Sequence, residues 1–354
     1  MLLPGFGEAG QRRLLESTAL IMGCGALGSV AADMLARAGV GHLRIVDRDF
    51  IELTNLQRQV LFDEQDVADA IPKAEAAKRK IARSNSQVEV TAIVDDLNHG
   101  NIEGYADGAD ILVDGLDNFE TRYLANDLSV KKGIPYAYGG AVSTVGMACA
   151  LLPHTLKSDA WWETMPEGSQ ATPCFRCIFE EPPPPGENLT CDTAGVIGPV
   201  VSIIANFQVA ETLKILTGNL QAVSPTMLSI DLWANRFTQL KVGRAWADGD
   251  CPTCKHHDFE YLDGKAGSSA TSLCGRNAVQ LRHRQTAAGI DLAEIAGRLE
   301  RHGKVKSNEF MVRAELAENG KDFEITLFAD GRAIVKGTGE ASVARSVYSK
   351  YVGN

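Results

Sequence analysis

The stretch "IMGCGALGSVAADMLARAGVGHLRIVD", residues 21–47, decides the fold class of this 354-residue chain. An apolar run leads into a glycine turn, a helical pattern and a second apolar run that ends in Asp47. The first two glycines allow a tight turn close to a phosphate, and the third allows a helix to pack on a strand. Asp47 follows Gly28 by 19 residues, where a carboxylate can accept from ribose hydroxyls. The stretch predicts a nucleotide site formed by Gly23, Gly25, Ala26, Gly28 and Asp47.

Apolar runs alternate with helical patterns on both sides of this stretch. Strands are expected to begin near Thr18, His42, Val88, Asp110 and Pro135, and helices to cover 27–38, 72–84 and 119–132. This βαβα order predicts an α/β, Rossmann-like domain with a mostly parallel sheet covered by helices on both faces. The alternation from Thr226 predicts one or two antiparallel strands that close the sheet.

The character of the chain changes after "DGKAGSSATS", a polar stretch that begins at Asp263. We therefore expect a nucleotide-binding domain over 1–262, a linker over 263–272 and a small α+β domain over 273–354. In the last of these, a helix over 291–300 precedes three strands, joined by Asn-Gly and Asp-Gly turns, and a final helix.

Composition limits the classes of partner. The net charge of −10 comes without a basic run, which argues against nucleic acid or an acidic membrane as the main partner. The N-terminal residues lack a signal-peptide pattern, so we expect a cytoplasmic protein with reduced thiols. The most apolar run, from Ala194, contains Pro199, Asn206 and Gln208, which favours a buried core or interface helix over a membrane span.

Polar residues beyond the nucleotide strand suggest phosphate chemistry. Asn55, Arg58 and Lys73 follow it, and cations of this kind neutralise the charge that grows on phosphate oxygens when an α-phosphorus is attacked. The alternative is that Arg58 and Lys73 are solvated surface charges. Asp117 follows a strand end and could hold Mg²⁺, or could serve as a helix cap, while Asn118 starts the next helix.

Cysteine spacing predicts a metal site. Cys174, Cys177, Cys251 and Cys254 form two Cys-x-x-Cys knuckles, which give four soft ligands in a tetrahedral array. No position is left open for water, so the expected Zn²⁺ is structural. Cys191 lies just before the apolar helix, where amides and the helix dipole could favour its thiolate; the alternative is a small buried side chain. Cys24 and Cys149 are expected to be packing residues, and Cys274 is left without a role.

Taken in order, these motifs resemble the ThiF/MoeB/HesA family of adenylyltransferases, which are related to ubiquitin-activating enzymes. The resemblance covers roughly residues 1–260 and is carried by "GCGALGS", "DRDFIELTNLQRQ", "PKAEAA", "DGLDN", "PCFRC", "LTCDTAGVIGPV" and "CPTC". It implies ATP rather than NAD, a zinc knuckle, a homodimer and a Cys191 that can bind the carrier's C-terminus covalently. It also implies site roles: Asp47 at the ribose, Asn55, Arg58 and Lys73 at the phosphates, and Asp117 at Mg²⁺.

The leading hypothesis is therefore an enzyme that adenylates the C-terminal glycine carboxylate of a ubiquitin-like sulfur carrier ending in Gly-Gly. Arg58, Lys73, Asp117 and Cys191 are the candidate catalytic residues, and a sulfur donor protein is a further expected partner. Two alternatives stay open. A nicotinamide-dependent oxidoreductase is favoured by the glycine turn and Asp47 alone. A carrier-binding adaptor is favoured because the sequence lacks the arginine that family members usually carry just before "LPGFG".

Overall fold

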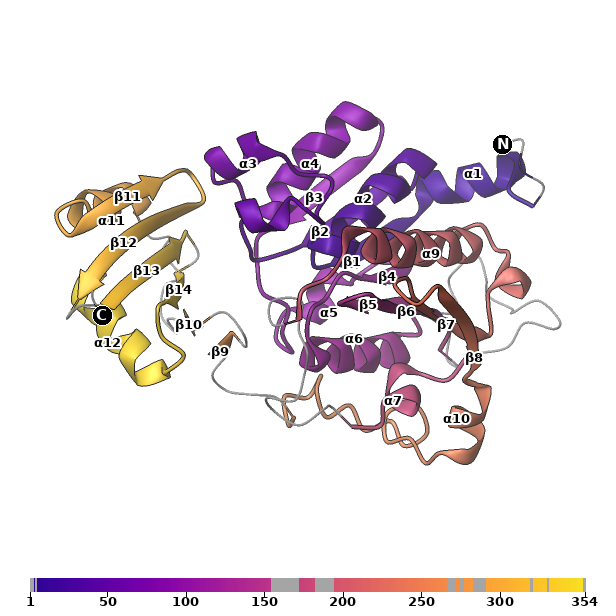
Figure 1. The fold of residues 1–354 in the computed structure, drawn as a ribbon. Coiled ribbons are helices and arrows are strands. Elements are labelled where there is room, and N and C mark those ends of the chain that lie inside the picture. The colour runs from indigo at the N-terminus through magenta and orange to yellow at the C-terminus, as the bar shows by residue number, and fades with distance from the viewer. Residues whose placement is uncertain are drawn as a thin grey trace. The chain divides into compact units, whose positions relative to one another are not determined.

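The computed structural model describes residues 3, 5–153, 172–181, 194–266, 272–273, 277–282, 291–318, 321–329 and 331–352. The chain divides into two compact units, Met1–Gly267 and Ser268–Asn354. Figure 1 labels the helices and strands of both units. Each unit is described separately below.

The first unit is built on an eight-stranded sheet with the order β3-β2-β1-β4-β5-β6-β7-β8. Neighbouring strands from β3 to β5 are parallel, and those from β5 to β8 are antiparallel. The strands in chain order are β1 Thr18–Met22, β2 His42–Val46, β3 Glu89–Ile93, β4 Ile111–Asp114, β5 Tyr136–Val142, β6 Val145–Leu151, β7 Thr226–Asp231 and β8 Arg236–Lys241. The predicted α/β class with a mostly parallel sheet is confirmed.

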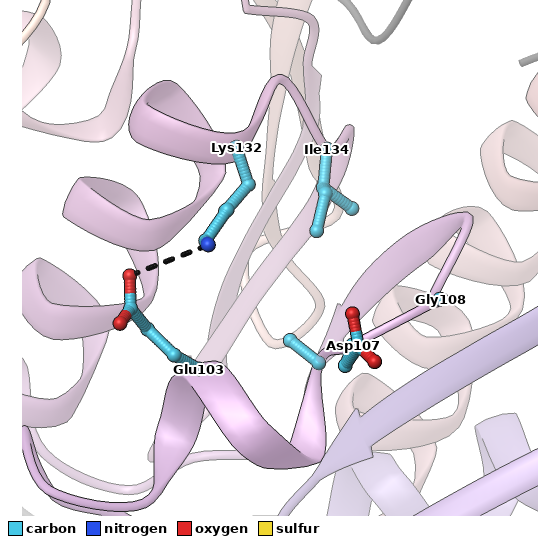
Figure 2. Close-up of a pocket in the computed structure, with 6 residues that line it drawn as sticks. Glu103, Asp107, Gly108, Lys132 and Ile134 are labelled. Carbon is cyan, nitrogen blue, oxygen red and sulfur yellow. Dashed lines mark ion pairs between the residues drawn. The ribbon is translucent and has the colours of Figure 1, made fainter. Parts of the chain in front are cut away.

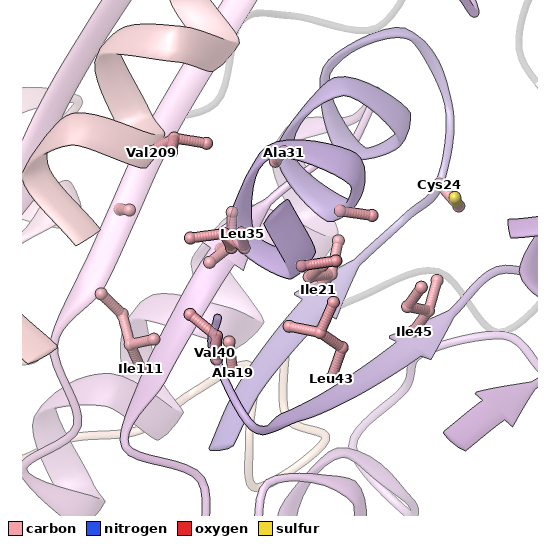
Figure 3. Close-up of a cluster of buried hydrophobic side chains, with 14 of the residues drawn as sticks. Ala19, Ile21, Cys24, Ala31, Leu35, Val40, Leu43, Ile45, Ile111 and Val209 are labelled. Carbon is pink, nitrogen blue, oxygen red and sulfur yellow. The ribbon is translucent and has the colours of Figure 1, made fainter. Parts of the chain in front are cut away.

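Helices cover both faces of this sheet because its central strands are apolar on both sides. On β1, Ala19 and Ile21 pack in one core with α2 and α9, while Leu20 and Met22 pack in another with α6. Figure 3 shows the first core, in which Leu35 and Val209 meet the strand residues. The helices of the first core are α1 Gly7–Glu16, α2 Ala26–Ala38, α4 Lys73–Ser84 and α9 Gly198–Leu216. Those of the second are α5 Ile102–Tyr105, α6 Phe119–Lys132 and α7 Phe175–Ile178.

Helix α9 is the apolar helix that the sequence indicated. By length and composition alone it could cross a membrane, yet 56% of its most apolar window is buried inside the fold. Gln208 and Glu211, both 1% exposed, lie among its buried residues. Gln208 donates from Nε2 to the carbonyl oxygens of Asp114 and Ala137, both at 2.9 Å. The helix therefore serves here as a core helix that reaches the sheet with polar as well as apolar side chains.

Several elements differ from expectation. The single strand predicted from Pro135 is a hairpin, because the chain reverses at Ser143, a non-glycine residue with φ +55 that gives no turn signal. The alternation from Thr226 forms two antiparallel strands, as predicted. The helix expected from Pro72 begins one residue later, because Pro72 is its N-cap. Six short or polar elements were not predicted: η1 Leu53–Asn55, α3 Glu64–Ala68, α5, α7, η2 Leu220–Ala222 and α10 Gly243–Asp248. Helix α1 was not predicted either.

The second unit contains a six-stranded antiparallel sheet with the order β11-β12-β13-β14-β10-β9. Its strands are β9 Ser272–Leu273, β10 Ala278–Arg282, β11 Gly303–Ser307, β12 Met311–Glu318, β13 Lys321–Phe328 and β14 Arg332–Lys336. Helices α11 Leu292–Leu299 and α12 Ala341–Tyr351 pack on alternate residues of these strands, such as Val312 and Ile325. The predicted α+β character is confirmed, and the sheet gains three strands beyond the three expected.

Candidate nucleotide site and four-cysteine centre

The glycine turn after β1 is packed backbone against backbone. Gly23 has φ +86, a region that favours glycine. A Cβ at Gly28 would overlap the carbonyl oxygen of Gly23, and one at Gly23 would meet the carbonyl oxygen of Gly115. Gly115, in the loop after β4, donates its N–H to the carbonyl of Met22 at 2.8 Å. The sequence analysis missed Gly115 as part of the turn, although it stands in the quoted "DGLDN" motif.

Asp47, at the end of β2, braces this turn. Its Oδ2 accepts from the Cys24 N–H at 2.6 Å and its Oδ1 from the Asp49 N–H at 2.7 Å. Burial raises the pKa of the Asp47 carboxyl, and the nearby Lys73 ammonium counteracts this shift. The carboxylate thus lies beside the turn, as its predicted role requires, while already holding two backbone groups. Contact with a ribose stays a prediction.

Lys73, the first residue of α4, is not a solvated surface charge. It is 4% exposed, and its Nζ lies 3.1 Å from Oδ2 of Asp49. Its backbone N–H also donates to the carbonyl of Asp49 at 2.9 Å. The alternative reading of Lys73 is therefore wrong, because the ammonium is buried and paired beside the glycine turn. Asp49 was not predicted as a site residue. It stands two residues after Asp47, and in an extended chain such residues face the same side, which could have indicated that Asp49 lies near the site.

Asn55 and Arg58 lie on the segment between β2 and α3. Asn55 is 6% exposed, and its Oδ1 accepts from the Glu52 N–H at 3.1 Å, which closes a capping box around η1. Arg58 donates from Nη1 to the carbonyl of Thr54 at 3.0 Å and remains partly exposed. The next residue, Gln59, is 3% exposed, and its Oε1 is buried without a hydrogen-bond partner. The amide nitrogen of Gln59 lies near Gly25, so this buried side chain is beside the glycine turn, a position that the sequence analysis missed.

Asp117 and Asn118 follow β4. Asn118 is the N-cap of α6, with Oδ1 accepting from the Thr121 N–H at 2.8 Å, so its predicted position at the helix start is confirmed. Asp117 is not the cap; its carboxylate is exposed and accepts a 3.1 Å bond from the Asn118 side-chain amide. A single accessible carboxylate fits Mg²⁺, which usually takes one or two protein carboxylates and completes its shell with phosphates and water.

All of these residues lie at the edge of the sheet where the parallel strands end. The order in which successive strands join the sheet reverses at β1, because β2 and β3 lie on one side of it and β4 and β5 on the other. Open α/β sheets bind ligands in the crevice at such a switch point. The pocket in Figure 2, lined by Glu103, Asp107, Lys132 and Ile134 among others, instead precedes the starts of β4 and β5. This pocket therefore lies at the amino ends of the parallel strands and is not the candidate nucleotide site.

The four predicted metal ligands come together in a cluster. Their sulfur atoms all lie within 4.8 Å of one another, with Cys174–Cys177 at 3.7 Å, Cys174–Cys251 at 3.6 Å and Cys177–Cys254 at 3.4 Å. Four sulfurs about 2.3 Å from one Zn²⁺ would be about 3.8 Å apart. The cluster is therefore compatible with a tetrahedral zinc site, and the predicted pairing of the two knuckles is confirmed.

Helix α6 anchors both knuckles to the sheet. Asn126 accepts at Oδ1 from the Phe175 N–H at 2.8 Å, beside the first knuckle. Asp127 accepts from the Thr253 hydroxyl at 3.1 Å in the second knuckle, and from the Tyr261 N–H at 2.9 Å. Burial raises the pKa of Asp127 to about 6, so the carboxyl is mostly ionised at neutral pH. These anchors were missed, because nothing in a helical sequence indicates which of its polar residues face a distant loop.

Four cysteines lie outside the cluster, and the structure describes two of them. Cys24 and Cys149 are buried, and burial raises the pKa of both thiols, which fits the predicted packing roles. Cys191 and Cys274 lie outside the described residues. The segment that leads into α9 is described from Ala194 on. There the carbonyl of Val196 accepts a 3.4 Å bond from Gln57, which places the start of α9 beside the segment that carries Arg58.

Comparison with known proteins gives consistent results. Residues 1–253 match the ThiF family. The chain is similar to the sulfur carrier protein ThiS adenylyltransferase of Bacillus subtilis, at 40% identity over 99% of this chain and 97% of that protein. It is also similar to the SAMP-activating enzyme E1 of Haloferax volcanii, at 34% identity over 75% of this chain and 93% of that protein. Among solved structures, E. coli MccB with ATP shares the fold, with a TM-score of 0.55 and 24% identity over 70% of this chain and 68% of that one.

Proposed function

Because the chain belongs to the ThiF family, we propose that it adenylates the C-terminal glycine carboxylate of a ubiquitin-like sulfur carrier protein, using ATP and releasing pyrophosphate. The observation that carries this proposal is the match to the ThiS adenylyltransferase of B. subtilis, which extends over 99% of the chain and both of its units. The similarity to an archaeal activating enzyme supports the same reaction class.

The site residues suit this chemistry. The carboxylate attacks the α-phosphorus, a new P–O bond forms, and pyrophosphate leaves with the electron pair. Such a transfer needs positioning and charge neutralisation more than a general base. The glycine turn at the N-terminus of α2 would receive phosphate oxygens, and Asp47 lies where a ribose would follow. Arg58 and Lys73 would bind phosphates; Asp117 would hold Mg²⁺, which supplies further neutralisation when bound.

The four-cysteine cluster would hold one structural Zn²⁺. Support comes from the sulfur spacing and from the four cysteine ligands themselves, a set that is typical of structural zinc sites. Such a metal would pin residues 172–181 and the segment after β8 to α6, and would take no part in the reaction.

The finer proposals concern partners. The carrier would end in Gly-Gly. Cys191 could attack the carbonyl carbon of its adenylate, so that a thioester forms while the bond from that carbon to the phosphate oxygen breaks and AMP leaves; a sulfur donor protein would then act on the thioester. Support is the position of residues 194–198 beside Gln57, next to Arg58.

We further propose a cytoplasmic homodimer, supported by the partly exposed Ile203 on α9 and by the family resemblance. Sedimentation at micromolar concentration would show a monomer if the dimer is wrong.

The test of the function is ATP–pyrophosphate exchange with each Gly-Gly-ending carrier of the same genome. Wild-type protein should exchange only with its carrier. Lys73→Ala should abolish exchange and, because it takes the buried ammonium away from the Asp49 carboxylate, should also lower the melting temperature, so exchange is measured at a temperature where the variant is still folded. Lys78→Ala, an exposed lysine on the same helix, is the matched control and should exchange normally. Full exchange by Lys73→Ala would refute the role of Lys73, and no exchange with any carrier would favour the adaptor.

A further inference from the structure

A buried ion pair lies beneath the loop that carries Asp117. The Asp114 carboxylate is fully buried and Arg122 is 7% exposed, and Nε of Arg122 lies 3.1 Å from Oδ2 of Asp114. The hydroxyl of Tyr136 donates to the same Oδ2 at 2.6 Å. Asp114 is the first residue of the "DGLDN" motif, but neither the sequence analysis nor the proposed reaction gives a role to Asp114, Arg122 or Tyr136, so the pair needs its own explanation.

The pair holds both backbone polar groups of one residue, Leu116. The Leu116 N–H donates to Oδ1 of Asp114 at 2.8 Å, and Nη2 of Arg122 donates to the Leu116 carbonyl at 2.6 Å. Nη2 also donates to the Gly139 carbonyl on β5 at 3.2 Å. Leu116 directly precedes Asp117, so both backbone groups of the residue before the carboxylate are fixed by side chains that are themselves buried.

The other side of the loop is equally constrained. The N–H of Gly115 bonds to Met22, and its Cα packs against Gly23 of the glycine turn. After Asp117, Asn118 caps α6, the helix on which Arg122 stands. The backbone on both sides of Asp117 is therefore fixed relative to the turn where phosphates are proposed to bind.

Energetics argue that this pair is not present for stability. Removing two charges from water costs about as much as their attraction returns, and buried pairs are often replaceable by apolar residues without loss. A planar guanidinium, however, can reach Asp114, Leu116 and Gly139 at once from a fixed direction, which a lysine ammonium cannot do. The pair therefore fixes the position of the Leu116 backbone rather than adding to the free energy of unfolding.

We propose that Arg122, acting through Asp114 and the Leu116 peptide, is a positioning residue that holds the Asp117 carboxylate in place for the metal of a bound Mg-nucleotide. This inference rests on the proposed function, in which Asp117 holds Mg²⁺. It predicts that loss of the guanidinium weakens the contribution of the metal to nucleotide binding, although Arg122 touches neither metal nor nucleotide.

The test measures binding rather than turnover. Calorimetry with a non-hydrolysable ATP analogue, with Mg²⁺ and with EDTA, gives the factor by which the metal tightens binding. Arg122→Lys should reduce this factor about tenfold, as loss of a group that orients a metal ligand usually does. Arg176→Lys is the matched control, because Arg176 also pairs with a carboxylate and stacks on an aromatic ring; it should leave the factor unchanged.

A double-variant comparison separates positioning from general loosening. If Arg122 acts through Asp117, Arg122→Lys should change nothing further in an Asp117→Asn background. If Arg122→Lys instead reduces the factor by which Mg²⁺ tightens binding equally in the wild-type and Asp117→Asn backgrounds, the inference is overturned. It is also overturned if folded Arg122→Lys protein shows the wild-type factor. Should Arg122→Lys fail to fold, Tyr136→Phe removes one bond to Asp114 and should reduce the factor by a smaller amount; an unchanged factor there would overturn the inference too.

The outcomes for the two proposals differ. Wild-type protein that binds the analogue with metal dependence but shows no carrier-dependent exchange would refute the proposed function and leave the role of Arg122 standing. Wild-type protein whose nucleotide binding is indifferent to Mg²⁺ would refute both.

Discussion

The glycine turn and the four-cysteine cluster are fixed in the same unit by opposite means. At the turn, the Gly23, Gly28 and Gly115 backbones touch directly and leave no room for a Cβ. At the cluster, four side chains meet, and their anchors on α6 are side chains as well. A backbone-packed site admits almost no substitution, whereas a side-chain site can be assembled or dissolved by a metal. The glycine turn is therefore held rigid by direct backbone contact, whereas the four-cysteine cluster depends on side chains and can respond to the presence of a metal.

The strongest test of this contrast is Gly28→Ala. The new Cβ would overlap the carbonyl oxygen of Gly23, which is backbone and cannot move aside. We expect a loss of more than about 4 kcal/mol of unfolding free energy, enough to leave little folded protein. Chemical denaturation of purified protein measures it. The control is Gly104→Ala on α5, where open space surrounds the new Cβ; a similar loss there would show that the turn is not special.

Removing one metal ligand should have the next largest effect. Cys251→Ser leaves three thiols and should abolish bound Zn²⁺, which elemental analysis should find at about one ion per wild-type chain. A loss of several kcal/mol would lower the melting temperature by on the order of 10 °C. Cys149→Ala, a buried thiol outside the cluster, should keep its metal. Wild-type protein that is free of metal and equally stable would contradict a structural zinc.

The anchor between α6 and the second knuckle should matter less. Asp127→Asn keeps the shape of the side chain but turns one acceptor into a donor facing backbone N–H groups. We expect a loss of about 1–3 kcal/mol of unfolding free energy. Thr253→Val removes only the hydroxyl that donates to Asp127 and should cost about 1 kcal/mol. If Asp127→Asn left the unfolding free energy unchanged, the contacts of Asp127 would not hold the knuckle, and the metal would have to.

The smallest effect is expected at Cys24, the buried residue between Gly23 and Gly25. Its N–H carries the bond to Asp47, and the buried thiol only fills space. Cys24→Ala should therefore cost about 1 kcal/mol and leave carrier-dependent exchange intact. Loss of exchange in a folded Cys24→Ala protein would mean that a side chain, and not only backbone, is needed at the turn.

Local pattern predicted much of the framework. Helix α6 was predicted with its observed bounds, because Asn118 gives a cap signal and Gly133 a stop. The two Cys-x-x-Cys pairs predicted the cluster, because each knuckle is local in sequence. The turn at Ser143 was missed because its positive φ is imposed by the neighbouring strands, not by a turn-forming residue.

Long-range partners were beyond the sequence. Lys73 was assigned to the phosphates, but its ion pair with Asp49 could not be predicted, because the spacing from Asp47 indicates only which side of the chain Asp49 faces. The bonds from Arg122 to Leu116 and Gly139, and from Gln208 to Asp114 and Ala137, join segments whose neighbourhood exists only after the sheet forms. Such contacts have no periodicity, so no pattern along the chain announces them.

The four-cysteine cluster also has a topological consequence. It closes a loop from Cys177 to Cys251 that contains α9, β7 and β8, so a bound metal would act as a reversible cross-link. A covalent cross-link of similar span lowers the entropy of the unfolded chain by an amount worth about 4 kcal/mol. Holoprotein would then start refolding with the ends of this loop already joined, whereas apoprotein would have to bring them together by diffusion.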